Sequence, residues 1–518
     1  MIKETELTIY PNKLNDKSLY KILAAKKLGV NEKEITAVRI MRRSVDARSK
    51  RAVYKVKVSV YINEEPQEAH DKIKFQHVRP DQKIIIVGSG PAGLFAAFRL
   101  LELGIKPVIL ERGKDVQERR KDLKLIQQDG IVNSDSNYCF GEGGAGTYSD
   151  GKLYTRSTKR GDVKRILNLL VQHGAQNDIL VDAHPHIGSN VLPKVIENMR
   201  NTILEYGGEI IFNAKVTDLI ITDSKLRGVI VNESEEYTGD AVILATGHSA
   251  RDIYYMLDKN NVTLEAKPFA MGVRIEHPQQ LIDSIQYHSS ERPENIPAAT
   301  YNLTCNIDNR GVYSFCMCPG GIIIPASTNS DELVLNGMSI SRRDSPFANS
   351  GLVVTVTEND WKKYKSHGIF AGLEYQKVVE RIAFDAGGEG QTAPAQRITD
   401  FVLKRTSKTL PQTSYIPGIV SSPLHEILPR SMVVRLQKSL HYFNKRMKGY
   451  YTEDAQILAA ETRTSSPIRI PRDKETLMHV QLKGLFPAGE GAGYAGGIVS
   501  AAIDGERCAN AVLKYVVS

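Results

Sequence analysis

Three short runs near the start of the chain alternate apolar and polar residues. They cover residues 6–10, 34–41 and 52–62, and they have the period of two that is typical of half-buried strands. In the third run, one face carries Val56, Val58, Val60 and Ile62. A basic stretch, residues 42–51, separates the second run from the third, and we expect it to form a loop.

A helical pattern lies between the first two runs, at residues 17–29. Asn15 or Asp16 is a suitable N-cap, and Gly29 suits the left-handed position that ends many helices. Together with the three strands, this helix predicts a small α+β domain over residues 1–80.

After residue 80 the pattern changes to strand, glycine turn and helix. Residues 83–112 contain an apolar run, a glycine turn, a stretch of helical periodicity and a second apolar strand, which is the pattern of a βαβ unit. Residues 207–231 and 239–247 predict further strands, whereas residues 266–470 mix short strands, turns and two helical stretches. We therefore expect an α/β fold in which a mixed α+β domain is inserted into a Rossmann-like domain.

The composition is that of a soluble protein, with 41% of its 518 residues hydrophobic and 25% charged. No segment approaches the roughly eighteen consecutive apolar residues that a membrane span needs, and the first residues contain no apolar signal region. We expect a cytoplasmic protein without a membrane span. The five cysteines are scattered and odd in number, so they do not form a disulfide framework. They are Cys139, Cys305, Cys316, Cys318 and Cys508.

The net charge of +9 is concentrated at the start of the chain. Residues 1–83 hold 19 Lys and Arg against 11 Asp and Glu, a net charge of +8. A basic face of this kind can bind nucleic acid, dock on the rest of the protein or serve solubility. We favour docking or solubility, because this segment has no recognisable RNA-binding motif and no stacking aromatic residues beyond Tyr54 and Tyr61.

Gly88, Gly90 and Gly93 form a GxGxxG motif directly after an apolar strand, and Glu111 closes the next strand. In a dinucleotide-binding loop the first glycine permits the tight turn and the second lets the backbone approach a pyrophosphate. The third lets the helix pack closely on the sheet. An acidic residue at the position of Glu111 accepts ribose hydroxyls and repels a 2′-phosphate. The motif therefore predicts FAD or NAD and disfavours NADP in this site.

A second glycine-rich stretch, residues 484–497, favours FAD over NAD. FAD is long, and its ribityl chain commonly needs a strand end far along the sequence. Glu490 can accept a hydrogen bond from a ribityl hydroxyl, and the amides of residues 495–497 can face the pyrimidine edge of the flavin. We expect residues 471–518 to complete the FAD-binding domain that begins with residues 81–265.

Nine stretches spread over nearly the whole chain carry a family resemblance. They are VGSGPAGLFAA, FGEGGAGTYSDGKL, HPHIGSN, ILATGHSARD, GVRIEHP, SFCMCPGG, TAPAQRITDF, ETRTSSPIRI and LFPAGEGAGYAGGIVSAA. With them, the chain resembles the two-dinucleotide-binding-fold flavoprotein superfamily and, within it, the FAD-dependent dehydrogenase family, also labelled NAD(FAD)-utilising dehydrogenases. The first, fourth and last stretches are superfamily signals, and the resemblance implies FAD.

The loop at residues 137–153 is rich in glycine, and a loop at this place approaches the flavin in related flavoproteins. The predicted cofactor-binding residues are Gly88, Gly90, Pro91, Ala92, Gly93, Glu111, Arg112, Gly143, Gly144, Gly146, Val216, Ala245, Thr246, Gly247, Gly489, Glu490, Gly496, Gly497 and Ile498. Because no second GxGxxG follows a strand, NADH or NADPH would dock only transiently as an electron donor. We predict no metal site.

Polar residues just after the glycine loop are candidates for contact with the flavin ring or a substrate. Ser149, Asp150 and Lys152 follow the loop directly, although each can equally be solvated or cap a turn. His184 and His186 can donate protons near neutral pH, or they can form a rigid turn before a helix. Of these residues, Lys152 and His186 are the candidates for catalysis.

Several arginines are candidate anchors for a carboxylate or phosphate group. They are Arg274, which has His277 nearby, Arg342, Arg343 and Arg463. Arg463 is the third candidate for catalysis, because its segment precedes the C-terminal flavin strand and can double back toward the ring. A surface salt bridge is the competing interpretation for each arginine.

Cys316 and Cys318 share one face if their segment is a strand. Three interpretations compete: packing in the core or the pocket wall, a metal pair with Cys305, and thiols that exchange electrons with the flavin. We favour packing, because a disulfide between cysteines two residues apart is strained.

The sequence therefore predicts an FAD-dependent oxidoreductase that transfers two electrons at flavin N5 to or from an unidentified small molecule. One alternative is an FAD-dependent RNA-associated or RNA-modifying protein, suggested by the basic N-terminal segment. The other is a flavin monooxygenase. The substrate and the oligomeric state are not predicted.

Overall fold

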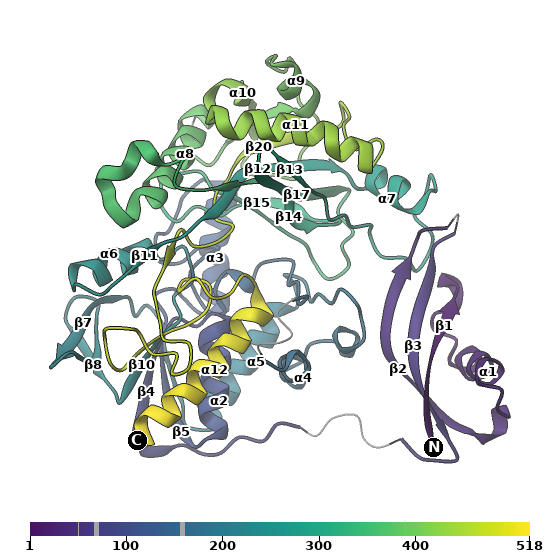
Figure 1. Cartoon of the computed structure of the whole chain (residues 1–518), viewed down its shortest axis with the longest axis horizontal. Coiled ribbons are helices and arrows are strands. Elements are labelled where there is room, and N and C mark those ends of the chain that lie inside the picture. The colour runs from purple at the N-terminus through teal and green to yellow at the C-terminus, as the bar shows by residue number, and fades with distance from the viewer. Residues whose placement is uncertain (50, 67–71, 156–160, 389, 518) are drawn as a thin grey trace.

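The computed structural model describes residues 1–49, 51–66, 72–155, 161–388 and 390–517. Figure 1 shows three parts: a small N-terminal domain at one side, a domain built around a parallel sheet, and a cap above it with helices on its outer face. No helix in the described part of the chain is long and apolar enough to cross a membrane.

The N-terminal domain is a three-stranded antiparallel sheet in the order β1-β3-β2, with one helix packed on it. The strands are β1 (Ile2–Ile9), β2 (Ile35–Asp46) and β3 (Val53–Ile62). Helix α1 (Lys17–Leu28) begins after Asp16, whose carboxylate accepts a hydrogen bond from the Leu19 N–H, and it ends at Gly29 with φ 66°. The buried face of β3 consists of Val56, Val58, Val60 and Ile62, as the alternating pattern predicts.

The basic stretch at residues 42–51 is partly strand, so the prediction of a loop there is wrong for its first half. β2 continues to Asp46, and Arg43 and Val45 pair with Val56 and Tyr54 of β3. Apolar residues of β3 on one face hold the longer strand in place, which overrides the polar character of this stretch.

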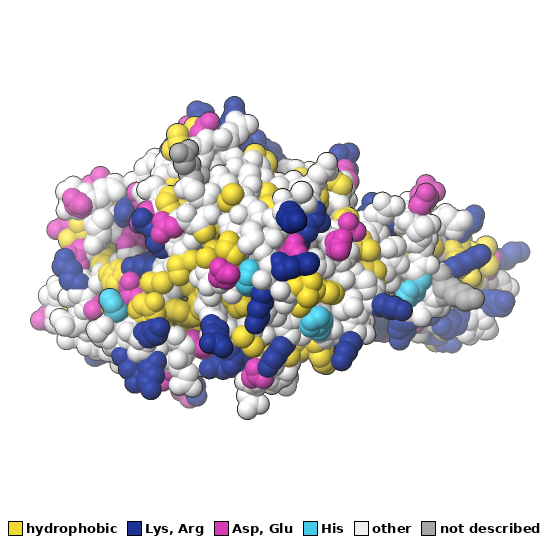
Figure 2. Space-filling view, turned by 90° about the horizontal axis from the view of Figure 1, so that it is seen from above, with side chains coloured by type: hydrophobic (Ala, Val, Ile, Leu, Met, Phe, Trp, Pro, Cys, Tyr) yellow, Lys and Arg dark blue, Asp and Glu magenta, His cyan; other side chains and the backbone are white. Residues whose placement is uncertain are grey.

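Arg43 docks the basic domain on the rest of the chain. Its Nε donates to the Asp182 carboxylate at 2.7 Å, and its Nη2 donates to Asp178 at 3.0 Å. A second contact reaches the cap, where the Tyr54 hydroxyl donates to the Asn295 carbonyl at 2.7 Å. Figure 2 shows other Lys and Arg side chains spread over the surface of this end of the molecule. The contacts support the docking interpretation of the basic segment.

A five-stranded parallel sheet in the order β22-β10-β4-β5-β6 forms the centre of the second domain. Its strands are β4 (Arg79–Val87), β5 (Ile105–Leu110), β6 (Glu209–Ile211), β10 (Ala241–Leu244) and β22 (Leu485–Pro487). Helices α2 (Pro91–Glu102) and α12 (Ile498–Val517) contribute to one apolar core with these strands. The C-terminal segment therefore returns to the same sheet that the GxGxxG strand occupies.

Further helices and a strand meander surround the parallel sheet. The meander β7-β8-β9 consists of Val216–Thr222, Lys225–Val231 and Glu235–Thr238. The helices are α3 (Val116–Gln128), α4 (Val163–Gln172), α5 (Leu192–Glu205) and α6 (Arg251–Lys259).

The cap is a seven-stranded sheet in the order β13-β14-β17-β12-β20-β18-β19. Its strands are β12 (Phe269–Pro278), β13 (Thr304–Ile307), β14 (Arg310–Cys318), β17 (Phe347–Val356), β18 (Ala393–Arg397), β19 (Ile419–Ser421) and β20 (Gln456–Glu461). Its helices are α7 (Gln279–Tyr287), α8 (Ala371–Gly387), α9 (Ile398–Leu403), α10 (Leu424–Ile427) and α11 (Arg430–Arg446).

Two short strand pairs complete the structure. β15 (Ile322–Pro325) and β16 (Leu335–Met338) form a hairpin. β11 (Glu265–Ala266) pairs with β21 (Ile468–Arg469) where the chain enters and leaves the cap. The cap is thus an insertion whose two connections lie side by side.

Candidate functional site

A cavity of about 370 Å³ lies where the strands of the parallel sheet end. Gly88 follows β4, Glu111 follows β5, Ala245 follows β10 and Glu490 follows β22, and all four line the cavity. The carboxyl ends of parallel strands are where open α/β sheets bind ligands. The cap closes another side of the cavity with Phe315 and Cys316 of β14.

The GxGxxG glycines have the three roles that the motif predicts. Gly88 has φ 102°, and a Cβ there would lie 2.6 Å from the Ala245 carbonyl oxygen. A Cβ at Gly93 would lie 1.9 Å from the Gly88 carbonyl oxygen, so this glycine lets α2 pack on the turn. At Gly90 a Cβ would approach only Gly144, at 3.9 Å, so the backbone here faces open space. A phosphate group could approach the chain at this point.

The N-termini of two helices lie at the cavity. Gly90 is the N-cap of α2 and Pro91 is its first residue, and both line the cavity. On the other side, Gly496, Gly497 and the first residue of α12, Ile498, also line it. Helix N-termini favour anions because of their free N–H groups and the helix dipole. The residues present therefore fit FAD, whose pyrophosphate would be held by N–H groups at a helix start.

Glu111 ties the loops of the cavity together. Its Oε2 accepts from the Ser89 N–H at 2.9 Å and from the Ser89 hydroxyl at 2.7 Å. Its Oε1 accepts from the N–H groups of Gly113 at 2.9 Å and Gly141 at 3.0 Å. Because a carboxylate has about four acceptor positions, this geometry assigns Glu111 a structural role, and its contact with a ribose stays a prediction.

Nearly all of the predicted cofactor-binding residues line the cavity. The exceptions are Gly93, Gly143 and Gly489, which belong to the same glycine-rich stretches but do not line the cavity. A Cβ at Gly143 would lie 2.0 Å from the Thr147 hydroxyl oxygen, and Gly143 has φ 75°. Gly489 has φ 76°, and its N–H donates to the Asp504 carboxylate at 2.9 Å. These two glycines permit turns, and the sequence pattern alone cannot separate this role from contact with a ligand.

The fold brings two of the candidates for catalysis together, because Lys152 and His186 pair in an isolated antiparallel β-bridge. Lys152 lines the cavity, together with Ser149 and Asp150. His186 lies outside the cavity wall, where its Nε2 is 3.0 Å from the Ser341 carbonyl oxygen, and burial lowers its pKa. His184 lies against Tyr154, with ring centroids 5.3 Å apart.

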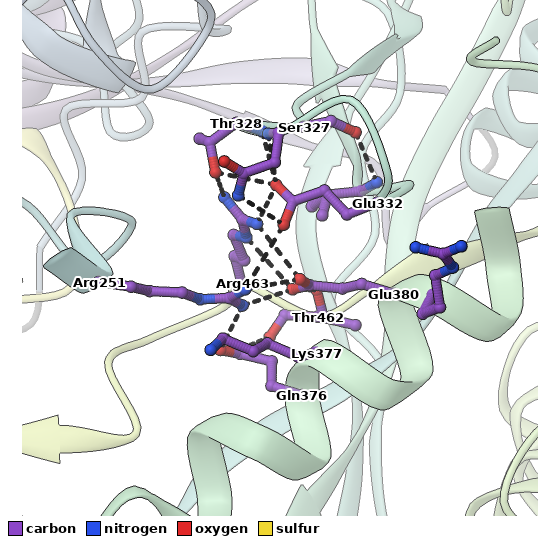
Figure 3. A network of polar contacts seen from close by, with 12 residues as sticks. Arg251, Ser327, Thr328, Glu332, Gln376, Lys377, Glu380, Thr462 and Arg463 are labelled. Carbon is purple, nitrogen blue, oxygen red and sulfur yellow. Dashed lines mark hydrogen bonds and ion pairs between the residues drawn. The ribbon is translucent and has the colours of Figure 1, made fainter. Parts of the chain in front are cut away.

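Arg463 does not line the cavity, so the structure gives no support for its predicted contact with a flavin or substrate. Figure 3 shows it inside a network between the cap and α6 that we call the cap cluster: Arg251, Glu332, Glu380 and Arg463. Arg463 donates to Glu332, to Glu380 at 3.2 Å and to the Thr328 hydroxyl at 2.8 Å. Its donors are therefore occupied by the protein.

The other arginine candidates have structural partners or face solvent. Arg343 donates to the buried Asp150 carboxylate at 3.0 Å and 2.5 Å. Arg274 donates to Glu461 at 3.1 Å and to Asn349 at 2.9 Å. The side chain of Arg342 is 79% exposed. His277 is fully buried, and burial lowers its pKa to about 4, so it is neutral near pH 7.

The cysteine pair lies at the cap side of the cavity. Cys318 is fully buried and Cys316 lines the cavity, which is the core and pocket-wall arrangement that we favour from the sequence. Lys152 brings its Nζ to 3.6 Å from the Cys316 sulfur and 3.5 Å from the Cys318 sulfur. Over the described residues, no group of three or more His, Cys, Asp and Glu side chains could hold a metal ion, and the metal interpretation with Cys305 therefore has no support.

Some cavity residues are not predicted from the sequence. They are Val87, Leu110, Cys139, Phe140, Ala145, Gly151, Tyr154, Ala214, Lys215, Ala250, Ile253, Phe315 and Ala501. Some of these residues lie inside stretches that the sequence singles out: Cys139 and Phe140 in the loop 137–153, and Ala250, Phe315 and Ala501 in stretches that carry the family resemblance. The sequence therefore indicates the stretches, but not the individual contribution of these residues to the cavity wall.

Three family models match separate segments of the chain. Residues 81–124 match an "FAD binding domain", and residues 268–464 match "FAD-dependent protein, C-terminal domain-like". Residues 1–61 match a domain of unknown function. The βαβ unit at the cavity belongs to the first match, so the fold and the site define a flavoprotein with a Rossmann-like FAD-binding domain.

The chain belongs to the same family as a protein from Clostridium beijerinckii that is named "Uncharacterized protein". The two are 41% identical over 509 residues, which is 94% of each chain. A thiamine thiazole synthase from Aeropyrum pernix is 28% identical over 160 residues, 31% of this chain and 46% of that protein.

Solved structures of flavoproteins resemble the fold at low sequence identity. The flavin-dependent brominase Bmp2 has a TM-score of 0.38 and 12% identity, over 84% of this chain and 79% of that one. A geranylgeranyl bacteriochlorophyll reductase-like protein from Thermoplasma acidophilum has a TM-score of 0.35 and 12% identity, over the same shares.

Proposed function

We propose that this chain is an FAD-dependent oxidoreductase of the dehydrogenase or reductase kind, acting on a small molecule between the parallel sheet and the cap. The observation that carries the proposal is the cavity at the carboxyl ends of β4, β5, β10 and β22. Its GxGxxG turn lies within the segment that matches an FAD-binding domain. FAD, when bound, supplies two-electron transfer at N5 of its flavin ring.

The chain's own residues divide the cavity into a binding end and a reacting end. At the binding end, the α2 N-terminus offers N–H groups to a pyrophosphate, and Gly90 leaves room for close approach. Glu490 lines the same cavity and is held by His248, whose Nδ1 lies 3.1 Å from its Oε2. This contact holds the carboxylate, which would accept a hydrogen bond from a ribityl hydroxyl.

Lys152, Phe315 and Cys316 form the reacting end, where the cap meets the glycine loop. The side chain of Lys152 is 34% exposed and lies 3.3 Å from Asp150. Burial favours its neutral form, but the neighbouring sulfurs and Asp150 raise the pKa of Lys152. It therefore holds a proton at Nζ and can stabilise negative charge on a substrate or on the ring, while Phe315 excludes water.

The test is an anaerobic screen on the full-length chain. The protein should be purified with its flavin, photoreduced, and mixed with candidate acceptors while the flavin absorption is followed. We expect a class of small molecules to reoxidise it without oxygen, and NADH or NADPH to be tested separately as donors. Reoxidation by oxygen alone, with stoichiometric hydrogen peroxide and no acceptor active, would replace the dehydrogenase proposal by an oxidase.

A further inference from the structure

Cys316 occupies an unusual backbone position at the cavity wall. The pairing of β14 with β17 shifts register between Phe315 and Cys318, and Cys316 has φ 45°. A non-glycine residue in the left-handed region is uncommon, and such positions cluster at functional sites. The irregularity leaves Cys316 in the cavity wall while Cys318 is fully buried.

Positive charge surrounds the two sulfurs. Besides Lys152, the fully buried Arg274 brings its Nη2 to 3.5 Å from the Cys318 sulfur and donates to the Cys316 carbonyl oxygen at 2.9 Å. Arg343 does not contact the sulfurs directly in this network, but it donates to Asp150, which lies beside Lys152. We call these groups, with the two cysteines and Glu461, the cavity cluster.

The fixed charges of the cavity cluster do not balance. Lys152, Arg274 and Arg343 are three cations, whereas Asp150 and Glu461 supply two carboxylates. Burial, together with negative charge at the Cys316 sulfur, raises the pKa of Glu461 to about 7, although Arg274 opposes this. Buried charge is costly unless it is paired. An additional anion among these cations would therefore be stabilised, and the cysteine sulfurs are the groups able to supply it.

The surroundings favour Cys316 as that anion. The neighbouring Cys318 thiol, followed by the charges of Lys152 and Arg274, lowers the pKa of Cys316 well below the ordinary range, although burial and Asp150 oppose this. The neighbouring Cys316 and burial raise the pKa of Cys318, whose sulfur donates to the Cys316 carbonyl oxygen at 3.3 Å. These opposite shifts favour negative charge on Cys316 over Cys318.

We propose that Cys316 is held as a thiolate in the cavity wall and is a thiol–disulfide exchange site for a small disulfide. The Cys316 thiolate attacks one sulfur of the disulfide and forms a mixed disulfide. The other sulfur leaves with the electron pair of the broken S–S bond and takes a proton from water. The step needs no flavin, and it goes beyond the proposed function.

Cys139 is a matched control inside the same cavity. It is also a free cysteine in the cavity wall, but its sulfur contacts the Ala326 carbonyl oxygen at 3.5 Å rather than a cation. The thiolate is the nucleophile in disulfide exchange. Because the Lys152 Nζ lies 3.6 Å from the Cys316 sulfur, we expect Cys316 to react about tenfold faster than Cys139 at pH 6.5.

The experiment uses the full-length chain and an aromatic disulfide whose released thiolate absorbs visible light. Wild type, Cys316→Ser and Cys139→Ser are mixed with it between pH 5.5 and 9, and the flavin content of each sample is recorded. We expect one fast thiol per chain in wild type and Cys139→Ser, and none in Cys316→Ser. Limiting iodoacetamide and peptide mapping of wild type should label Cys316 first, which needs no variant.

Lys152 supplies the second test. Lys152→Met should move the pH at which the fast phase appears upward, whereas Lys152→Arg should keep it near the wild-type value. A fast phase that survives in Cys316→Ser would overturn the proposal. So would a wild-type rate that falls tenfold per pH unit below pH 8. Both readouts are independent of flavin, so they separate this inference from the oxidoreductase proposal.

Discussion

The cap cluster and the cavity cluster are both buried groups of charged side chains, but they differ in charge balance and in access. In the cap cluster, Arg251 and Arg463 face Glu332 and Glu380, two cations against two carboxylates, and no member lines the cavity. The cavity cluster has an excess of cations, and Lys152, Asp150 and Cys316 line the cavity. A balanced, enclosed network stabilises the fold, whereas an unbalanced network at a cavity is suited to chemistry.

The largest expected effect comes from breaking the cap cluster. Arg463→Met leaves Glu332 and Glu380 with one buried cation fewer, and removal of one partner from a buried ion pair costs about 3 to 5 kcal/mol. Urea unfolding at pH 7 should show this loss, and the exposed Arg342→Met should change stability by less than about 0.5 kcal/mol. If Arg463→Met is as stable as wild type but inactive, the arginine belongs to the chemistry instead.

The next largest effect is a loss of FAD affinity, caused by a change in the cavity wall. Gly90→Val places a branched side chain where the backbone faces open space. FAD affinity should fall about a hundredfold, which corresponds to about 2.7 kcal/mol, while the FAD-free chain loses only about 1 kcal/mol of stability toward urea, because valine is a poorer N-cap than glycine. The FAD affinity of Gly90→Ala should lie between the affinities of Gly90→Val and wild type. Full FAD content in folded Gly90→Val would remove this cavity as the cofactor site.

Acid should weaken the cap cluster, because Glu332 is charged in the folded protein and has a lowered pKa. Burial raises the pKa of Glu332, but Arg463 and Arg251 lower it well below 4.5 overall. A carboxyl group with a lowered folded pKa contributes stability above its unfolded pKa, and this contribution is lost as the pH falls below about 4.5. Such a group contributes about 2 to 3 kcal/mol. Unfolding free energies between pH 7 and pH 3 should therefore fall more steeply in wild type than in Glu332→Gln, and equal slopes would contradict the assignment.

The smallest expected effect sharpens the comparison within the cavity itself. Glu490→Ala removes one acceptor for a ribityl hydroxyl, which is worth about 1 to 3 kcal/mol, or roughly a five- to 150-fold loss of FAD affinity. Glu490→Gln keeps one oxygen acceptor and should lose less. Titration of the FAD-free chains with FAD measures both losses, and unchanged affinity in Glu490→Ala would assign the C-terminal glycine stretch another role.

Local patterns explain which elements could be predicted. The GxGxxG turn, α1 with Asp16 and Gly29, and the buried face of β3 depend on residues close together in the sequence. Such patterns report periodicity and turn chemistry directly.

Contacts between distant residues explain the failures. Arg463 is bound by Glu332 and Glu380, each more than 80 residues away, and Lys152 meets Cys316 across 164 residues. Sequence spacing does not predict contacts between residues that are separated in the sequence by much of the cap. The sequence therefore shows both the motif around Arg463 and the cysteine pair as candidates. Only the structure distinguishes the arginine, which is bound by carboxylates, from the thiol at the cavity.

The identity of the bound flavin tests the central claim most directly. Full-length protein should be purified, its visible spectrum recorded, and the flavin released by heat and separated by chromatography. We predict a yellow protein that releases FAD and no FMN, at about one FAD per chain. A folded, colourless protein that gains no flavin absorption when it is incubated with FAD would contradict the account.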